Sequence, residues 1–597
     1  MAMEQMPVLE LLWNLVSRKT ENISRVHYFP QKSAFPKRKN NEVSLPRETP
    51  ESQGISSEKI EKLLCDLNNG AHTHMHQFMI LRNGKVITEC GFAPYERDLW
   101  HASYSLCKSI TGIAIGMLVD ERKLQIQDKV LDILKKPKNF MSFIRQRDLT
   151  VEHLLTMSSG VSFNETGAVS GNEWVKSFLE SSVHFAAGTC FEYNSMNSYM
   201  LSAIVTEITG ETMMEYLRPR LWKPLGIERV FWETCPKGIT KGGWGLFLRP
   251  EDAAKIGQLY LQNGKWNQKQ LISEKWVYDS TSFKIQVPKE MGFGGYGYQI
   301  WMGERPGSYV FNGMLGQNVL VYPDLQMVIV TNAGNNVLFQ HCEMLDIISR
   351  CFTKNYVPKD VLPSNFIKYQ KLQKTIAYLE GKQKKRRVLR DGVKKYFYSY
   401  RKEKQTRSFL EHLDGKKYQM QEHHVGIFPL VLQVFHNNYT DGIESISFHK
   451  TGRDFYIYMK EGSVCHKLKT GICEWEENQI QLHEEVYQIA VYAEKAKDED
   501  GRDVLKIQAV FTEDAVRRNI KIFFKNDTLK EIEIRWAELP GTEMIFEGLN
   551  SVTESMTEHP VIKGIKQKGI ADILQMLINQ TIEPVTKGFL ENNPLTK

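Results

Sequence analysis

A serine and a lysine three residues apart form the most reactive pairing in this sequence. Ser105 and Lys108 stand in the tetrapeptide S-L-C-K at the start of a predicted helix, and residues three apart share one helix face. A serine hydroxyl is a weak nucleophile at neutral pH unless a neighbouring base takes its proton. A lysine amine can be that base if burial lowers its pKa. The unpaired backbone N–H of Ser105 at the helix start can also bind an oxyanion.

The residues around this pair predict one buried helix. The segment from His101 to Leu124 is apolar nearly all round, which is typical of a helix in a protein core. A lysine in the first turn of such a helix needs a partner, because burying an unpaired charge is costly. The alternative is a solvated lysine at a frayed helix end. Chance occurrence of S-x-x-K is common, so the pair needs support from elsewhere in the chain.

A tyrosine provides a second candidate group. Tyr193 follows a Gly-Thr turn and precedes a predicted amphipathic helix, 196–209, that Gly210 ends. A tyrosine at such a place usually packs or forms a surface hydrogen bond. Beside Lys108, its phenol can relay the proton of the nucleophile.

A third segment combines glycines with a predicted hairpin. Asn312-Gly313-Met314 and Gly316-Gln317 lead into two strands joined by Pro323-Asp324. Glycines at the edge of a strand let a ligand approach the backbone closely.

These three segments resemble, in order, the motifs of the serine β-lactamase and penicillin-binding-protein superfamily. The resemblance is to its class C-like branch, which also contains esterases, D-aminopeptidases and 6-aminohexanoate-dimer hydrolases. Ser105 and Lys108 match S-x-x-K, Tyr193 and Ser195 match the Y-x-N or Y-x-S motif, and 312–314 stand where K-T-G or H-x-G is usual. The similarity covers roughly residues 50–352 and includes Trp244-Gly245-Leu246. It implies an α+β fold of the β-lactamase/transpeptidase type: an antiparallel sheet with flanking helices, an all-α lobe, and the active site between them.

The resemblance also implies roles for individual residues. Ser105 would be the nucleophile, with Lys108 and Tyr193 as the base. Backbone amides of Ser105 and Met314 would form the oxyanion hole. The substrate-binding and oxyanion-hole set would be Ser195, Asn312, Gly313 and Met314. Asn312 lacks the charge that holds a substrate carboxylate in β-lactamases and peptidases, which favours uncharged amides or esters.

Three functions therefore compete. The favoured one is a serine hydrolase that cleaves an amide or ester bond of a small molecule through a Ser105 acyl-enzyme. The second is D-amino-acid peptidase, DD-carboxypeptidase-like or β-lactamase activity. The third is a non-catalytic binding descendant of the fold. No cofactor and no metal is expected: the sequence holds no cysteine–histidine cluster with zinc spacing.

Pattern changes along the chain predict five parts. Residues 397–545 carry alternating apolar residues between turn signals, which predicts a mostly-β domain. The five parts are an N-terminal extension (1–49), the catalytic domain (50–356), a basic helical connector (357–396), the β-rich domain (397–545) and a C-terminal helical tail (546–597).

Composition limits the partners. The 597 residues carry a net charge of only +7. The basic run 381–395 could suggest nucleic acid or anionic lipid, but a solvated connector is favoured, and no nucleic-acid partner is expected. Nine scattered cysteines without a C-x-x-C pair indicate a reducing compartment. With no recognisable signal peptide or membrane-spanning segment, a cytoplasmic location is expected. The sequence gives no oligomeric state.

Overall fold

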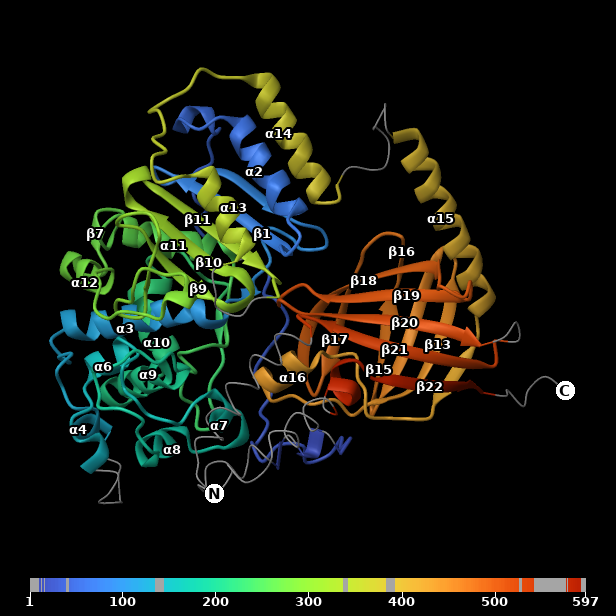
Figure 1. The fold of residues 1–597 in the computed structure, drawn as a ribbon, viewed down its shortest axis with the longest axis horizontal. Helices are drawn as coiled ribbons and strands as arrows, with labels where there is room; N and C mark the ends of the chain where they lie inside the picture. The colour runs from blue at the N-terminus through green and yellow to red at the C-terminus, as the bar shows by residue number, and fades with distance from the viewer. Residues whose placement is uncertain are drawn as a thin grey trace. The chain divides into compact units, whose positions relative to one another are not determined.

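The computed structural model divides the chain into two compact units (Figure 1). One unit spans Phe35–Lys382, and the other combines residues 1–34 with residues 383–597. The second unit is thus built from two separate stretches of the chain. The division into five consecutive parts remains a prediction. The described residues are 10–11, 13–15, 17–38, 42–134, 144–336, 342–382, 392–525, 529–541, 576 and 578–591.

A six-stranded antiparallel sheet forms the centre of the first unit. Its strand order is β2-β1-β11-β10-β9-β8. Along this order the strands are Lys85–Gly91, Met75–Arg82, Met327–Ala333, Gln317–Tyr322, Tyr309–Gly313 and Trp301–Met302. The predicted hairpin is confirmed: β10 and β11 pair in register, with Val319 opposite Val330.

Helices cover both faces of this sheet (Figure 1). On one face, α2 (Ser57–Asn69) packs with α13 (Glu343–Cys351) and α14 (Phe366–Leu379). On the other face, α11 (Pro250–Leu261) approaches closely, because Gly257 lies against the side chains of Val319 and Val328. Residues of β10 and β11 are buried on both faces, so these strands read as continuous apolar runs rather than alternating ones.

An all-helical lobe stands beside the sheet, as predicted. Its centre is α9 (Ser195–Thr209), which contacts α3 (Cys107–Asp120) and other helices of the lobe. These include α4 (Val130–Leu134), α6 (Val151–Leu155), α7 (Glu165–Ser170), α8 (Trp174–Glu180) and α10 (Met213–Leu217). The expected amphipathic character of α9 is wrong: all of its residues from Ser195 to Val205 are buried, because helices surround it. Gly210 ends it in the left-handed conformation, at φ 73°.

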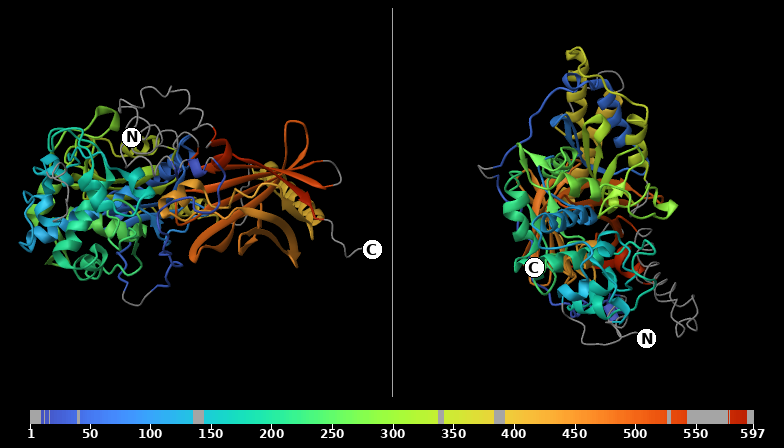
Figure 2. Two further views of the ribbon diagram at one scale, coloured as in Figure 1. Left: turned by 90° about the horizontal axis from the view of Figure 1, so that it is seen from below. Right: turned by 90° about the vertical axis from the view of Figure 1, so that its left-hand side faces the viewer.

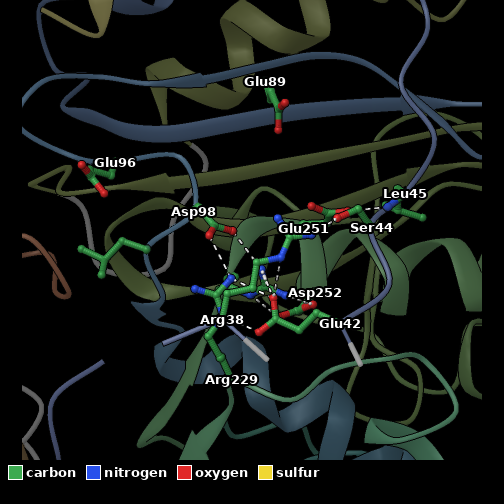
Figure 3. Close-up of polar contacts among 12 residues, drawn as sticks. Arg38, Glu42, Ser44, Leu45, Glu89, Glu96, Asp98, Arg229, Glu251 and Asp252 are labelled. Atoms are coloured by element: carbon green, nitrogen blue, oxygen red, sulfur yellow. Dashed lines mark hydrogen bonds and ion pairs between the residues drawn. The ribbon is translucent and has the colours of Figure 1, made fainter. Parts of the chain in front are cut away.

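An ion-pair network ties the segment after residue 41 to this unit (Figure 3). The buried Glu42 carboxylate binds the guanidinium of Arg229 at 2.5 Å. Arg249, next to α11, binds Asp98 at 2.8 Å and Asp252 at 2.7 Å. Lys255 binds the same Asp252 at 3.1 Å.

The second unit is mostly β, which confirms the predicted C-terminal domain. Its sheet order is β15-β14-β13-β12-β22-β21-β20-β19-β18-β16, with β17 paired to β18. Along the chain the strands are Lys417–Met420, Ile443–Thr451, Asp454–Glu461, Val464–Lys469, Gly471–Ile472, Glu476–Leu482, Glu485–Lys497, Asp503–Phe511, Arg517–Lys525, Glu531–Leu539 and Val585–Leu590, numbered β12 to β22. The sheet curls (Figure 2), and the Asn478 side chain on β17 exchanges hydrogen bonds of 2.6 and 2.9 Å with the backbone of Lys469 on β15.

The structure corrects two predictions that the sequence made for this unit. The expected helical tail is wrong for 585–590, which form β22 between β12 and β21; most of the rest of that tail lies outside the described residues. A 22-residue helix, α15 (Gly392–Leu413), runs past the predicted end of the connector. Its mixture of charged and apolar residues resembles the alternation of a strand region, so the sequence pattern places the start of the β-rich part too early. No helix among the described residues has the length and apolarity needed to cross a bilayer.

Candidate active site

Ser105 lies in a tight turn rather than inside a regular helix. The turn is the 3-10 segment η2 (Tyr104–Leu106), and α3 begins at the next residue. Tyr104 has φ 47°, a left-handed conformation that costs a bulky residue about 1–3 kcal/mol and often accompanies functional sites. The Ser103 amide donates to Leu246 O at 2.8 Å, which holds the turn from outside. The chain therefore presents Ser105 on a strained, well-anchored turn.

Lys108 is buried and points at the serine. Its side chain is 1% exposed, and Nζ lies 2.7 Å from Ser105 Oγ and 2.8 Å from Gly243 O. Both partners are neutral oxygens. Burial lowers the pKa of Lys108 to about 8, so roughly a tenth of the amine is unprotonated at pH 7, and the neutral fraction rises with pH. The predicted pairing of the two side chains is thus present as a short contact.

The carbonyl that holds Lys108 comes from a glycine pair. A Cβ atom at Gly243 would lie 2.8 Å from Ser195 O, so only glycine fits this close approach to α9. Gly242 O accepts the Thr111 hydroxyl at 2.7 Å. The pair therefore lies between the helices of Lys108 and Ser195. Sequence reasoning noted the neighbouring Trp244-Gly245-Leu246 but missed this role; two adjacent glycines before a tryptophan were the available signal.

Tyr193 completes the polar group around the serine. Lys108 Nζ lies 4.9 Å from the centre of its ring, and the ring stacks on Trp301 with centroids 5.5 Å apart. Burial raises the pKa of Tyr193 well above its usual value, although a hydrogen bond with Ser105 opposes this. The phenol therefore remains protonated at neutral pH and is not a phenolate.

Glu165 is a site residue that sequence reasoning missed. Its Oε1 accepts the Ser195 backbone N–H at 2.8 Å, at the first residue of α9 and two residues after Tyr193. Its negative charge raises the pKa of both Lys108 and Tyr193. Glu165 is the first residue of the short helix α7 and lies 28 positions before Tyr193. No local sequence pattern identifies it as a site residue.

Ser195 and its neighbour have mainly structural contacts. Asn194 caps α9 by accepting the Met196 N–H at 2.9 Å. Its Nδ2 donates to Val161 O and Phe163 O at 3.0 and 2.9 Å. Ser195 itself is buried at the N-terminus of α9 against Gly243. These contacts fix the loop that carries Tyr193.

The third motif lies next to the nucleophile turn. A Cβ atom at Gly313 would collide with Ser103 O and approach Leu106 N to 3.0 Å. Strand β9 thus touches η2 through the glycine backbone. Met314 begins the turn η5 (Met314–Gly316), which contacts η2. The structure brings the turns of Ser105 and Met314 together, as an oxyanion hole shared by their amides requires.

The side-chain amide of Asn312 donates a hydrogen bond within the sheet. Its Nδ2 donates to Asn318 Oδ1 at 2.7 Å, and Asn318 Nδ2 donates to Thr331 Oγ1 at 3.1 Å. The Thr331 hydroxyl in turn donates to Gly316 O at 2.9 Å. A carbonyl only accepts, so this chain fixes the direction of each bond. Asn312 therefore contributes no charge, and one of its two N–H donors is used within the sheet.

Comparison with known proteins agrees with this geometry. The protein-family model described as Beta-lactamase matches residues 61–338. A 6-aminohexanoate-dimer hydrolase of Paenarthrobacter ureafaciens is 26% identical over 287 residues, which cover 42% of this chain and 71% of that protein. The protein flp of Staphylococcus aureus (strain N315) is 28% identical over 188 residues. These residues cover 28% of this chain and 37% of the flp protein.

A solved penicillin-binding-protein homologue from Caulobacter crescentus shares 15% identity with this chain at a TM-score of 0.40. The alignment covers 50% of this chain and 94% of that structure. The match of the family model, together with the relatives, confirms the resemblance that the three motifs predicted. Residues 61–338 of this chain therefore match the beta-lactamase family.

Proposed function

We propose that the chain is a serine hydrolase that cleaves an amide or ester bond of a small, uncharged molecule through an acyl-enzyme on Ser105. One observation carries the proposal: the buried Lys108 Nζ lies 2.7 Å from Ser105 Oγ, with its pKa lowered to about 8. A neutral amine at this distance can accept the serine proton directly.

Acylation begins with transfer of the Ser105 hydroxyl proton to Lys108 Nζ as Oγ attacks the substrate carbonyl carbon. The carbonyl π electrons move to oxygen, and the oxyanion is stabilised by the amides of Ser105 and Met314. Collapse of the tetrahedral adduct breaks the bond to the leaving group. The leaving group takes a proton from Tyr193 or from the Lys108 ammonium. The Lys108 ammonium, whose pKa is about 8, is the stronger acid of the two. The nearby phenol of Tyr193 can relay its proton to the leaving group, which returns Lys108 to the neutral amine.

Deacylation reverses the proton path with water as the nucleophile. Water loses a proton to the amine of Lys108 while its oxygen attacks the acyl carbon. The second tetrahedral adduct then expels Ser105 Oγ, which regains a proton. Both halves need an amine that gains and loses a proton near neutral pH, and burial of Lys108 supplies that property.

The third motif supports an uncharged substrate. Asn312 carries no charge, and one of its two N–H donors is occupied by Asn318. A substrate carboxylate would thus find no cation at this position. The Paenarthrobacter relative is named for a 6-aminohexanoate dimer. Because that dimer ends in a carboxylate, it is the contrasting amide to test beside uncharged amides and simple esters.

Covalent labelling tests this proposal. The wild-type protein should react with a fluorophosphonate, and mass spectrometry should place the adduct on Ser105. Ser105→Ala should abolish labelling and hydrolysis. Ser109→Ala is the matched control: it removes a buried hydroxyl from the first turn of α3, one that donates to Gln299 O at 2.7 Å, and should keep the labelling. An adduct on another residue, or full hydrolysis by Ser105→Ala, would contradict the proposal.

Labelling should be followed by a panel of acyl donors. We expect turnover of uncharged esters or amides and weak or absent turnover of penicillins and cephalosporins. Efficient β-lactam hydrolysis would favour the β-lactamase alternative, and release of a C-terminal D-amino acid would favour the peptidase alternative.

A further inference from the structure

A basic groove lies in the second unit, where α15 runs along the curled sheet. Residues of α15 form one wall, and the ends of β18 and β19 with their connecting turn form the other. Its volume is about 1640 Å³. We propose that this groove binds a soluble small molecule that carries two or more phosphate groups. The proposal is independent of the hydrolase site, because every residue of the groove belongs to the second unit.

The charge of the groove is the first argument. Seven lysines and arginines line it against three carboxylates, a net charge of +4, while the whole 597-residue chain carries only +7. Phosphate oxygens are preferred partners of such cations, because each accepts several charge-assisted hydrogen bonds. The groove thus concentrates much of the positive excess of the chain in one concave place.

The acids of the groove are already paired. Glu494 binds Lys402 at 2.5 Å, and Asp503 binds Lys495 and Lys497 at 2.8 and 2.7 Å. Asp500 binds Arg502 at 3.0 Å. The carboxylates therefore hold the walls in place, and they leave little negative charge to neutralise further cations.

Three cations remain in excess. Arg401 and Lys404 stand three positions apart on α15 and so share a helix face. Lys506 faces them from β19, where its Cα partner across the ladder is Glu494. Within the described part of the chain, no ion pair engages any of these three side chains. Ligands with several anionic groups can satisfy cations on both walls at once.

The shape of the groove favours a small polyanion over larger partners. The groove is concave, whereas a bilayer surface is flat on this scale. Its aromatic residues, Phe409 and Phe524, are buried in the floor and pack edge-to-face with centroids 5.2 Å apart. They offer no exposed ring face for stacking bases, as single-stranded nucleic-acid sites do.

Titration calorimetry with inorganic tripolyphosphate tests the proposal on the full chain. The expected result is saturable binding at low salt that weakens as salt rises, because screening lengths fall below about 10 Å above 0.1 M ionic strength. The variant Arg401→Gln/Lys404→Gln/Lys506→Gln should bind at least about tenfold more weakly, since each lost charged hydrogen bond contributes substantially to binding.

A matched variant removes the same charge elsewhere. Arg453→Gln/Lys467→Gln/Lys587→Gln changes three exposed cations of the same unit that lie outside the groove, and it should bind tripolyphosphate like the wild type. Circular dichroism and thermal unfolding establish that both variants fold. Equal weakening in the two variants, or no saturable binding by the wild type, would overturn the proposal. Tighter binding to phosphatidylserine vesicles or to single-stranded DNA, lost in the groove variant, would also overturn it by assigning the groove to a membrane or a nucleic acid.

Discussion

Two buried lysines in the first unit have the same sequence spacing from their partners, but the partners differ in charge. Lys108 follows Ser105 by three residues near the start of α3, and Lys255 follows Asp252 by three residues in the first turns of α11. Both lysines are nearly fully buried. Lys255 binds a carboxylate at 3.1 Å, whereas Lys108 binds two neutral oxygens.

The partner decides what each lysine can do. An adjacent anion offsets the cost of burying an ammonium group, whereas neutral partners leave that cost to favour the free amine. Lys255 belongs to the ion-pair network around Asp252, whose carboxylate also binds Arg249. We infer a structural role for Lys255 and a chemical role for Lys108, and the following experiments test that contrast.

The largest effect is expected at Lys108. Lys108→Arg keeps a cation but cannot accept a proton, and Lys108→Met fills a similar volume without a base. Each should lower kcat/KM by about 10³-fold or more, the scale seen when a member of a catalytic unit is removed. Thermal unfolding of Lys108→Met should be unchanged or shifted upward, because a buried amine is lost. An active Lys108→Arg enzyme would move the base role to Tyr193.

The matched change in the network should act on stability. Asp252→Asn removes the carboxylate that Arg249 and Lys255 share, and it should lower the free energy of unfolding by about 3–5 kcal/mol, as breaking a buried ion pair does. Denaturant unfolding measures this. The turnover per folded molecule should stay near that of the wild type. Lost turnover with unchanged stability would reverse the roles assigned to the two regions.

Gly313 tests how tightly the third motif is packed against the nucleophile turn. The sequence pattern alone predicts that a branched side chain would fill the acyl space; the contacts place it against Ser103 O and Leu106 N instead. Gly313→Val should therefore displace the turn of Ser105, with a loss of stability of about 1–3 kcal/mol from overpacking and a large loss of turnover. Gly303 is also tightly packed, but it follows β8 and lies against Ser308. Gly303→Val is therefore a control that should lose stability with less effect on kcat.

Asn312 tests the substrate class. Asn312→His or Asn312→Lys should shift preference toward carboxylate-bearing substrates by about 1–3 kcal/mol, the range for a charged hydrogen bond. The ratio of kcat/KM for matched neutral and carboxylate esters measures this shift. Asn318→Ala, which removes the partner of Asn312 Nδ2, separates loss of the polar chain from gain of charge. A carboxylate preference in the unmodified protein would contradict the role assigned to Asn312.

The sequence predicted the elements of the site better than their contacts. Ser105 and Lys108 are predicted together because residues three apart share a helix face, and Tyr193 is predicted from its place before a helix and from the Y-x-S motif of the resemblance. Gly243 and Glu165 were missed because they reach the site through tertiary contacts, from positions distant in the chain. Strand β22 was missed because its pairing with β12 and β21 decides its conformation more than its own residues do.

The smallest expected effect concerns the pH dependence of turnover. The base form of Lys108 is the neutral amine, so kcat/KM should rise with pH through about 8, the pKa of Lys108. Glu165 favours the ammonium form, so Glu165→Gln should move this rise to lower pH while its amide oxygen still accepts the Ser195 N–H. Glu152→Gln is the control: Glu152 accepts the Tyr298 hydroxyl at 2.6 Å in the same lobe, and the rise should keep its position. A shift to higher pH in Glu165→Gln would show that Glu165 does not act on Lys108 through its charge.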